Sequence, residues 1–311
     1  MEIKQYKKWE NLYTTAKNEE RGKVSFKKLE VLWFNTGTLC NLSCENCYIE
    51  SNPKNDRLVY LTLDDVKKYI DEVKENQWEL ESIGITGGEP FLNPHIIDIL
   101  RECLSLNIPV LVLTNAHKVL KRWEKKLIEL KDEYGDLLRL RVSLDHYTKE
   151  VHEGERGDGT FNPTLKSMQW LYQNGFHISI AGRSLFKESE EVAKKGYQDL
   201  VDSNQIKLKL DKDTLVIFPE MNATEDVPEI TVDCWNILNV SPSDQMCATQ
   251  RMIVRRKNEE TPKVLSCTLI AYNKEFELGT TLRESFKDIH LNHPFCSKFC
   301  VLGGASCSST K

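Results

Sequence analysis

Apolar and polar positions follow two alternating patterns along residues 29–218. Short runs rich in β-branched and aromatic residues, typical of strands, lie at 29–35, 82–86, 109–115, 137–144, 176–182 and 214–218. Between these runs, apolar residues recur at helical spacing. Strands that alternate with helices are typical of parallel βαβ units, and six such units can curl into part of a barrel. We therefore predict an α/β fold, a partial (β/α)6 TIM-like barrel, with its chemistry at the carboxyl ends of the strands.

Local capping signals predict where several of the helices begin and end. Thr62 and Asp65 have the spacing of a capping box, so a helix is expected to begin after Thr62. The remaining expectations are helix starts at Asn93-Pro94 and Asn162-Pro163, a helix end at Gly175, and helices over 120–130 and 189–202.

The alternation stops near residue 219, where the composition also changes. Six of the ten cysteines and five of the ten prolines lie from this point to the end of the chain. We predict three parts, namely an N-terminal segment (1–28), the barrel (29–218) and a cysteine-rich auxiliary domain (219–311). Acidic and basic residues are interleaved in the N-terminal segment, which favours a solvated stretch of chain.

Charge and hydropathy exclude several classes of protein. The formal net charge of −5 lacks the basic balance of a nucleic-acid-binding protein, so nucleic acid is not an expected partner. No apolar run approaches the roughly 20 residues of a membrane span, and the first residues do not resemble a secretory signal. We expect a cytoplasmic protein without a membrane partner. Ten cysteines in that reducing compartment favour metal or cluster ligation over disulfides.

Three cysteines follow the first predicted strand directly, in the pattern Cys40-x3-Cys44-x2-Cys47. Thiolates suit zinc or iron–sulfur clusters, and three thiolates leave one iron of a four-iron cubane open to an external ligand. One alternative is that the three cysteines share the buried face of a helix, but the surrounding Gly, Asn and Ser residues favour turns. The other alternative is zinc, for which no fourth ligand lies nearby in the sequence.

This pattern resembles the Cys-x3-Cys-x2-Cys signature of the radical S-adenosylmethionine (SAM) superfamily, and the segment Gly87-Gly88-Glu89-Pro90 resembles its Gly-Gly-Glu-Pro motif. The resemblance implies that the three cysteines hold a [4Fe-4S] cluster whose open iron is chelated by the amino and carboxylate groups of SAM. An electron from the cluster would then split the sulfonium into methionine and a 5′-deoxyadenosyl radical. A flavodoxin-type or ferredoxin-type electron donor is implied as a partner.

The resemblance, taken with position at strand ends, also assigns cofactor-binding residues, namely Tyr48, Gly87, Gly88, Glu89, Pro90, Asn115, Ser143, Asp145 and Arg183. Tyr48 would lie against the adenine, while Ser143 and Asp145 match the position from which the family contacts the ribose. Glu89 would accept hydrogen bonds from the ammonium group of SAM. Arg183 would pair with the methionyl carboxylate of SAM, because a guanidinium has the geometry to bind a carboxylate.

Some of these residues have alternative interpretations. Gly87 and Gly88 would let the backbone approach a ligand closely, although the motif alone is also compatible with a strand-to-helix turn. Asn115 is compatible with a ligand contact or with a cap or turn. His152 and Arg156, in a stretch that resembles a loop of SPASM-type members, are interpreted as structural, with His152 otherwise an acid or base.

The cysteines near the carboxyl terminus resemble those of SPASM and twitch auxiliary domains. Their pattern is Cys247-x19-Cys267 followed by Cys296-x3-Cys300-x6-Cys307, with Cys234 as a sixth cysteine. The resemblance implies a second, auxiliary [4Fe-4S] cluster, with Cys247, Cys267, Cys296 and Cys300 as preferred ligands and Cys307 able to replace one of the last two. Structural zinc is the alternative, because thiolates alone do not separate zinc from iron. A hairpin is expected at 252–254 and 264–265, and Cys103, on an apolar helical stripe, is expected in the core.

The resulting hypothesis is a radical SAM enzyme whose 5′-deoxyadenosyl radical abstracts hydrogen from a substrate held between the barrel and the auxiliary domain. Oxidation or cross-linking, with the auxiliary cluster as electron acceptor, is the expected outcome. A small-molecule substrate is favoured over a ribosomal peptide or a protein side chain. The rival hypothesis is a non-catalytic iron–sulfur or zinc protein for electron transfer or interaction.

Overall fold

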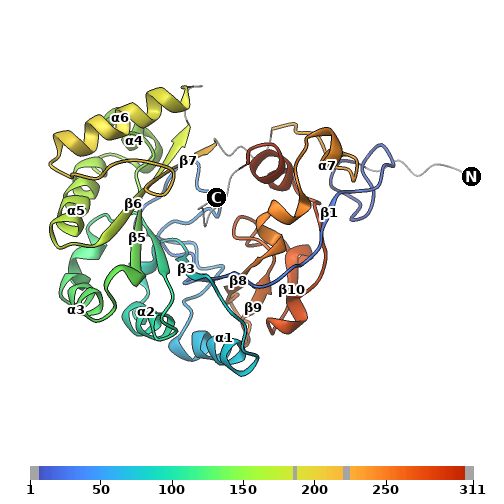
Figure 1. The fold of residues 1–311 in the computed structure, drawn as a ribbon, viewed down its shortest axis with the longest axis horizontal. Helices are drawn as coiled ribbons and strands as arrows, with labels where there is room; N and C mark the ends of the chain where they lie inside the picture. The colour runs from blue at the N-terminus through green and yellow to red at the C-terminus, as the bar shows by residue number, and fades with distance from the viewer. Residues whose placement is uncertain (1–6, 185–187, 220–224, 305–311) are drawn as a thin grey trace, which may run out of the picture.

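A computed structural model describes residues 7–184, 188–219 and 225–304 of the chain. Six parallel strands form most of one curved sheet (Figure 1), and they are β2 (Val31–Asn35), β3 (Ser82–Thr86), β4 (Val110–Thr114), β5 (Leu138–Ser143), β6 (His177–Ser184) and β7 (Leu215–Pro219). These strands match the six predicted ones. Since β7 ends the strand order without pairing to the other edge, the barrel stays open. The predicted partial (β/α)6 barrel is confirmed.

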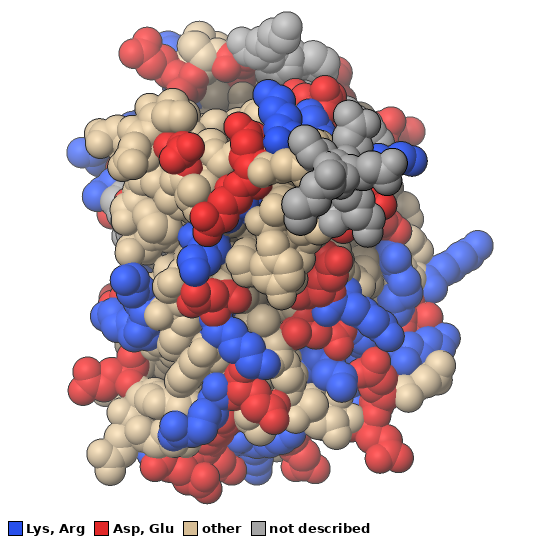
Figure 2. Space-filling model, turned by 90° about the vertical axis from the view of Figure 1, so that its right-hand side faces the viewer, with Lys and Arg blue, Asp and Glu red and all other residues tan. Residues whose placement is uncertain are grey.

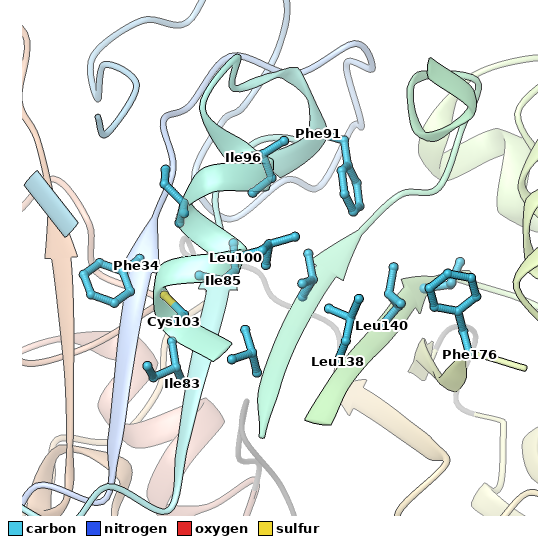
Figure 3. Close-up of a cluster of buried hydrophobic side chains, with 14 of the residues drawn as sticks. Phe34, Ile83, Ile85, Phe91, Ile96, Leu100, Cys103, Leu138, Leu140 and Phe176 are labelled. Carbon is cyan, nitrogen blue, oxygen red and sulfur yellow. The ribbon is translucent and has the colours of Figure 1, made fainter. Parts of the chain in front are cut away.

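Helices cover the outer face of this sheet (Figure 1). They are α1 (Leu63–Glu75), α2 (Ile96–Leu104), α3 (Glu124–Tyr134), α4 (Lys149–Arg156), α5 (Phe161–Gln173) and α6 (Glu190–Ser203). The short helix α7 (Cys234–Ile237) belongs to the C-terminal region. Apolar side chains of the strands pack against α2 through Ile96, Leu100 and Cys103 (Figure 3). Cys103 is fully buried there, so its predicted place in the core is confirmed.

Two of the capping predictions hold, and the two Asn-Pro predictions are wrong. Thr62 and Asp65 form the capping box of α1, and Gly175, with φ +72°, follows the end of α5. The Asn93 side chain accepts a hydrogen bond from the His95 amide and donates to two distant carbonyls, so α2 begins only at Ile96. Helix α5 begins at Phe161, ahead of Asn162-Pro163.

The C-terminal region extends the sheet of the barrel. Strand β8 (Gln250–Val254) pairs in parallel with β2, and β9 (Lys263–Leu265) and β10 (Glu277–Gly279) continue the sheet in antiparallel register. The hairpin of β8 and β9 confirms the predicted one. The division of the chain at residues 28 and 218 stays a prediction, since one sheet runs across the second of these points.

The described part of the N-terminal segment packs onto the C-terminal region. Strand β1 (Lys23–Val24) pairs antiparallel with β11 (Ile289–His290). Arg21 is 1% exposed and forms an ion pair with Glu229 at 2.7 Å. The prediction of a solvated segment is wrong for Arg21, whereas the other charged residues described up to residue 28 are exposed. Interleaved charges do not reveal that one of them has a distant buried partner.

Charges of both signs are mixed over the face of the molecule formed by this N- and C-terminal region (Figure 2). On this face the described residues form no extended basic surface of the kind that follows a nucleic-acid backbone. Within the described ranges, no helix combines the length and the apolar character that crossing a bilayer requires.

Candidate active site

One cavity lies at the carboxyl ends of the barrel strands, as predicted. Its lining includes ten residues that the sequence assigns to the cluster or the cofactor, namely Cys40, Cys44, Cys47, Tyr48, Gly87, Gly88, Asn115, Ser143, Asp145 and Arg183. These residues come from loops that are far apart in the sequence. Parallel strands bring their carboxyl ends to one edge of a sheet, which explains why the assigned residues meet there.

The three N-terminal cysteines lie in an irregular loop rather than on a helix. Backbone amides donate to two of the sulfurs, from Leu42 to Cys40 at 3.4 Å and from Ser51 to Cys47 at 3.3 Å. Burial, with a smaller contribution from the charges of Glu89, Cys44 and Cys47, raises the pKa of Cys40 to about 12, although the hydrogen bond from the Leu42 amide opposes the shift. The free Cys40 thiol is therefore protonated at neutral pH, whereas a bound metal holds such a group as the thiolate.

No group of three His, Cys, Asp or Glu side chains among the described residues has the arrangement needed to bind one metal ion. A zinc site requires its ligands around a single centre. In a cubane, by contrast, each thiolate binds a different iron atom, so the sulfurs stand farther apart. The arrangement of the described cysteines therefore gives the zinc alternative no support, and their ligation of a cubane stays a prediction.

Gly87 and Gly88 pack against the stretch of chain that leads into Cys40. The Gly88 amide donates to the Gly37 carbonyl at 2.8 Å, and the Glu89 amide donates to the Leu39 carbonyl at 3.1 Å. A Cβ atom on Gly88 would stand 2.4 Å from the Leu39 oxygen, and Gly87 has a φ of +147°. Glycine is required at Gly88 for close contact with the backbone of the cysteine loop, in addition to any approach to a ligand.

Glu89 and Pro90 are buried outside the lining of the cavity. The Glu89 carboxylate accepts hydrogen bonds from the Thr114 hydroxyl at 2.9 Å, the Asn115 amide at 2.8 Å and the Phe91 amide at 3.0 Å. Burial raises its pKa to about 7, and these hydrogen bonds oppose that shift. In this arrangement Glu89 joins the ends of β3 and β4, and the ammonium contact assigned to it stays a prediction.

Asn115 forms the turn that was one of the two roles its sequence position left open. Its side-chain oxygen accepts from the His117 amide at 2.9 Å, as in an Asx turn. Its side-chain nitrogen is directed at the cysteine loop, 3.0 Å from the Asn41 oxygen and 3.7 Å from the Cys40 sulfur. Asn115 therefore positions the loop of the first cysteine, and a direct contact with SAM stays a prediction.

Helix α4, which the sequence patterns do not predict, brings two further charged residues to the cavity. Arg156 forms a two-pronged ion pair with Asp145, with both distances at 2.9 Å. Burial raises the pKa of Asp145, but the Arg156 charge outweighs this and the net pKa is lowered. The neighbouring Glu155 binds Arg183 and also accepts from Asn46 of the cysteine loop.

Arg183 keeps one donor free for a ligand. Its Nη1 atom pairs with Glu155, while Nη2 is buried without a hydrogen-bond partner among the described residues. Since unpaired buried donors are costly, a carboxylate in the cavity would satisfy this group. The positive charges of Arg156 and Arg183 also lower the pKa of Cys44, against the larger effect of burial.

His152 is fully buried and does not line the cavity. Its ring packs edge-on against Phe161, and burial lowers its pKa to about 4. These surroundings support the structural interpretation of His152 and not an acid or base role.

The C-terminal cysteines gather at a second place. Cys247, Cys267 and Cys296 are close enough that the charges of Cys267 and Cys247 raise the pKa of Cys296, after the larger effect of burial. Cys300 follows on the same π-helical turn, η8 (Cys296–Val301). Cys234 lies in α7 beside Thr231, and Cys307 lies outside the described residues. Three of the four preferred ligands thus lie near one another, and the assignment of all four as cluster ligands stays a prediction.

The two cysteine groups flank the same cavity. The Cys267 sulfur accepts from the Leu269 amide at 3.3 Å, and Leu269 lines the cavity. Phe299, next to Cys300, lines it too. The cavity therefore reaches from the first cysteine loop to residues that are close in sequence to the C-terminal cysteines.

An open barrel of parallel strands, with a three-cysteine loop after its first strand and a cavity beside that loop, is the arrangement expected of an iron–sulfur protein of the α/β-barrel class. The model of the Radical SAM superfamily matches residues 34–194, just over half of the 311-residue chain. The chain belongs to this superfamily of enzymes, whose cofactors are a [4Fe-4S] cluster and SAM.

Several relatives are similar to parts of this chain. The antilisterial bacteriocin subtilosin biosynthesis protein AlbA of Bacillus subtilis is 34% identical over 48% of this chain and 32% of its own length. Mycofactocin maturase MftC of Mycobacterium tuberculosis is 28% identical over 44% of this chain and 33% of its own length. The matches thus span about a third of these relatives. The crystal structure of Streptococcus suis SuiB bound to SAM shares the fold, with a TM-score of 0.59 and 16% identity over 81% of this chain and 63% of that one.

Proposed function

We propose that this protein cleaves SAM reductively at a [4Fe-4S] cluster held by Cys40, Cys44 and Cys47, and that it oxidises or cross-links a substrate in the adjoining cavity. The observation that carries the proposal is the single cavity shared by these cysteines, by the strand-end residues and by the wall beside the C-terminal cysteines. When bound, the cluster and SAM supply a 5′-deoxyadenosyl radical that abstracts a hydrogen atom from the substrate.

The polar residues of the cavity have distinct roles in this proposal. The free Nη2 donor of Arg183 binds the methionyl carboxylate. The Asp145 carboxylate accepts two hydrogen bonds from Arg156 and has lone pairs left to accept others. Together with Ser143, it binds the ribose hydroxyls. Tyr48 lies against the adenine. Asp145 and Arg183 are held by Arg156 and Glu155 before SAM arrives, which reduces the cost of ordering the site.

The cavity also has apolar lining residues, among them Phe218, Leu269 and Phe299. Excluding water at these residues protects a carbon radical from side reactions. Cys267 and Cys300 are close in sequence to Leu269 and Phe299, and in this proposal they hold the auxiliary [4Fe-4S] cluster together with Cys247 and Cys296. This cluster then accepts the electron that the substrate radical releases.

The substrate in this proposal is the side chain of a peptide. The names of AlbA and MftC describe a bacteriocin biosynthesis protein and a maturase, and another SuiB structure of the same fold is described as bound to the precursor peptide SuiA. This replaces the small molecule favoured by the sequence alone. A flavodoxin-type or ferredoxin-type donor and a cytoplasmic location stay predictions.

Anaerobic incubation of the cluster-replete protein with dithionite and SAM is expected to give 5′-deoxyadenosine and methionine in equal amounts, because one sulfonium is split for each electron delivered. Chromatography with mass detection measures both products, and a sample without dithionite is the control. Cluster-replete protein that forms no 5′-deoxyadenosine under these conditions refutes the proposed function.

A further inference from the structure

Arg251 is a buried cation beside the C-terminal cysteines. It lies in β8 and is 1% exposed, with its guanidinium 4.4 Å from the centre of the Phe26 ring. Its donors reach only backbone carbonyls, from Nε to Ser285 at 3.0 Å and from Nη1 to Cys247 at 2.7 Å and to Gln250 at 2.6 Å. Its Nη2 atom is buried without a hydrogen-bond partner among the described residues.

Two other arginines of the interior pair with a carboxylate, whereas Arg251 has no carboxylate partner within the described ranges. Arg21 pairs with Glu229, and Arg156 pairs with Asp145. A guanidinium stays protonated in proteins, so Arg251 carries a positive charge. Its Nη1 atom donates to the Cys247 carbonyl, which places this charge next to the C-terminal cysteines.

A buried charge without an opposite charge is costly. Backbone carbonyls offset part of that cost through their dipoles, but they carry no net charge. Thiolates at Cys247 and its neighbours would supply the missing negative charge, because a cluster with cysteine ligands is anionic. The position of Arg251 is thus explained by a negative group at the C-terminal cysteines.

We propose that Arg251 is the counter-charge of the auxiliary cluster and raises its reduction potential. This inference rests on the auxiliary cluster of the proposed function. Reduction adds one electron, and hence one negative charge, to the cluster. A fixed positive charge nearby stabilises that reduced form more than the oxidised form. Arg251 therefore makes the cluster a better acceptor for the electron that the substrate radical loses when it is oxidised.

The test compares the midpoint potential of the auxiliary cluster in the unmodified protein with that in variants of the same chain. Electron paramagnetic resonance during an anaerobic redox titration measures this potential. Arg251→Gln keeps a donor for the Cys247 carbonyl but removes the charge. Its auxiliary cluster is expected to have a more negative midpoint potential than that of the unmodified protein. The first cluster, whose signal responds to SAM, is the internal reference and should keep its potential.

Ser285→Asp is a second variant that leaves Arg251 in place and adds a carboxylate beside it. It is expected to shift the potential in the same direction, which makes the test independent of whether Arg251→Gln folds. Arg256→Met is the matched control, since Arg256 follows the far end of β8 and already pairs with Glu277 at 2.7 Å. It should leave the potential unchanged.

An auxiliary cluster that keeps its potential in Arg251→Gln or Ser285→Asp overturns the inference and leaves the proposed function standing. If the unmodified protein holds only one cluster, both the proposal of an auxiliary cluster and the inference about Arg251 are wrong. The SAM cleavage assay then tests the rest of the proposed function separately.

Discussion

Replacement of Cys44 by Ala is expected to abolish formation of 5′-deoxyadenosine and to remove about four iron atoms per chain, because a cubane with one open iron needs all three protein thiolates. Cys44 lines the cavity and lies beside the positive charges of Arg156 and Arg183, which stabilise an anionic cluster. Iron and sulfide analysis of anaerobically purified protein, together with the SAM cleavage assay, measures both effects.

Cys103→Ala is the matched control for this prediction. Cys103 is buried in the core on α2, and its thiol lies among Ile96, Leu100 and other apolar side chains (Figure 3). Its replacement should cost about 1 kcal/mol of stability and leave both iron content and SAM cleavage unchanged. Normal iron content in Cys44→Ala, or loss of iron in Cys103→Ala, is incompatible with the assignment of the ligands.

Replacement of Arg156 by Met is expected to lower the free energy of unfolding by about 3–5 kcal/mol, because it leaves the Asp145 carboxylate buried without a partner. Asp145 is 3% exposed, and both of its oxygens bind Arg156. Chemical denaturation measures the change. SAM binding should weaken as well, since Asp145 lines the cavity and depends on Arg156 for its orientation.

The control for this second prediction is an ion pair on the surface. Lys195 and Asp199 pair on α6 with side chains that are 78% and 63% exposed. Lys195→Met should change the free energy of unfolding by no more than about 1 kcal/mol, because water screens exposed pairs. Equal decreases in the free energy of unfolding of Arg156→Met and Lys195→Met would mean that the Arg156–Asp145 pair contributes no more than an exposed ion pair.

The strands and the place of the site were predictable because they depend on local pattern. Each of the six barrel strands is a short apolar run between helices, and the carboxyl ends of parallel strands meet at one edge. Residues directly after those runs, such as Asn115 and Ser143, therefore fall around one cavity. The motif of three cysteines then indicates which chemistry that cavity serves.

Features that depend on distant partners were not predictable. Asn93 reads as a helix cap, yet its side chain binds the carbonyls of Thr36 and Leu61. Arg21 reads as a solvated charge, yet its partner Glu229 lies 208 residues away in the sequence. Such contacts form only when the chain has folded, and they override local propensity.

Helix α4 and its residue Glu155 were missed for a related reason, whereas Arg156 was interpreted as structural without its partner being known. The helix spans only Lys149–Arg156 and buries a single residue, so it has no apolar stripe that a sequence pattern reveals. Its position is set by Glu155 and Arg156, which bind Arg183 and Asp145. The parallel pairing of β8 with β2 likewise joins segments that no local signal connects.

A crystal structure of the cluster-replete protein with SAM, obtained without oxygen, tests the central claim most directly. It is predicted to show a [4Fe-4S] cluster bound by Cys40, Cys44 and Cys47, with the amino and carboxylate groups of SAM on the fourth iron. A metal with four protein ligands at this loop, or SAM bound away from the cavity, would contradict the account.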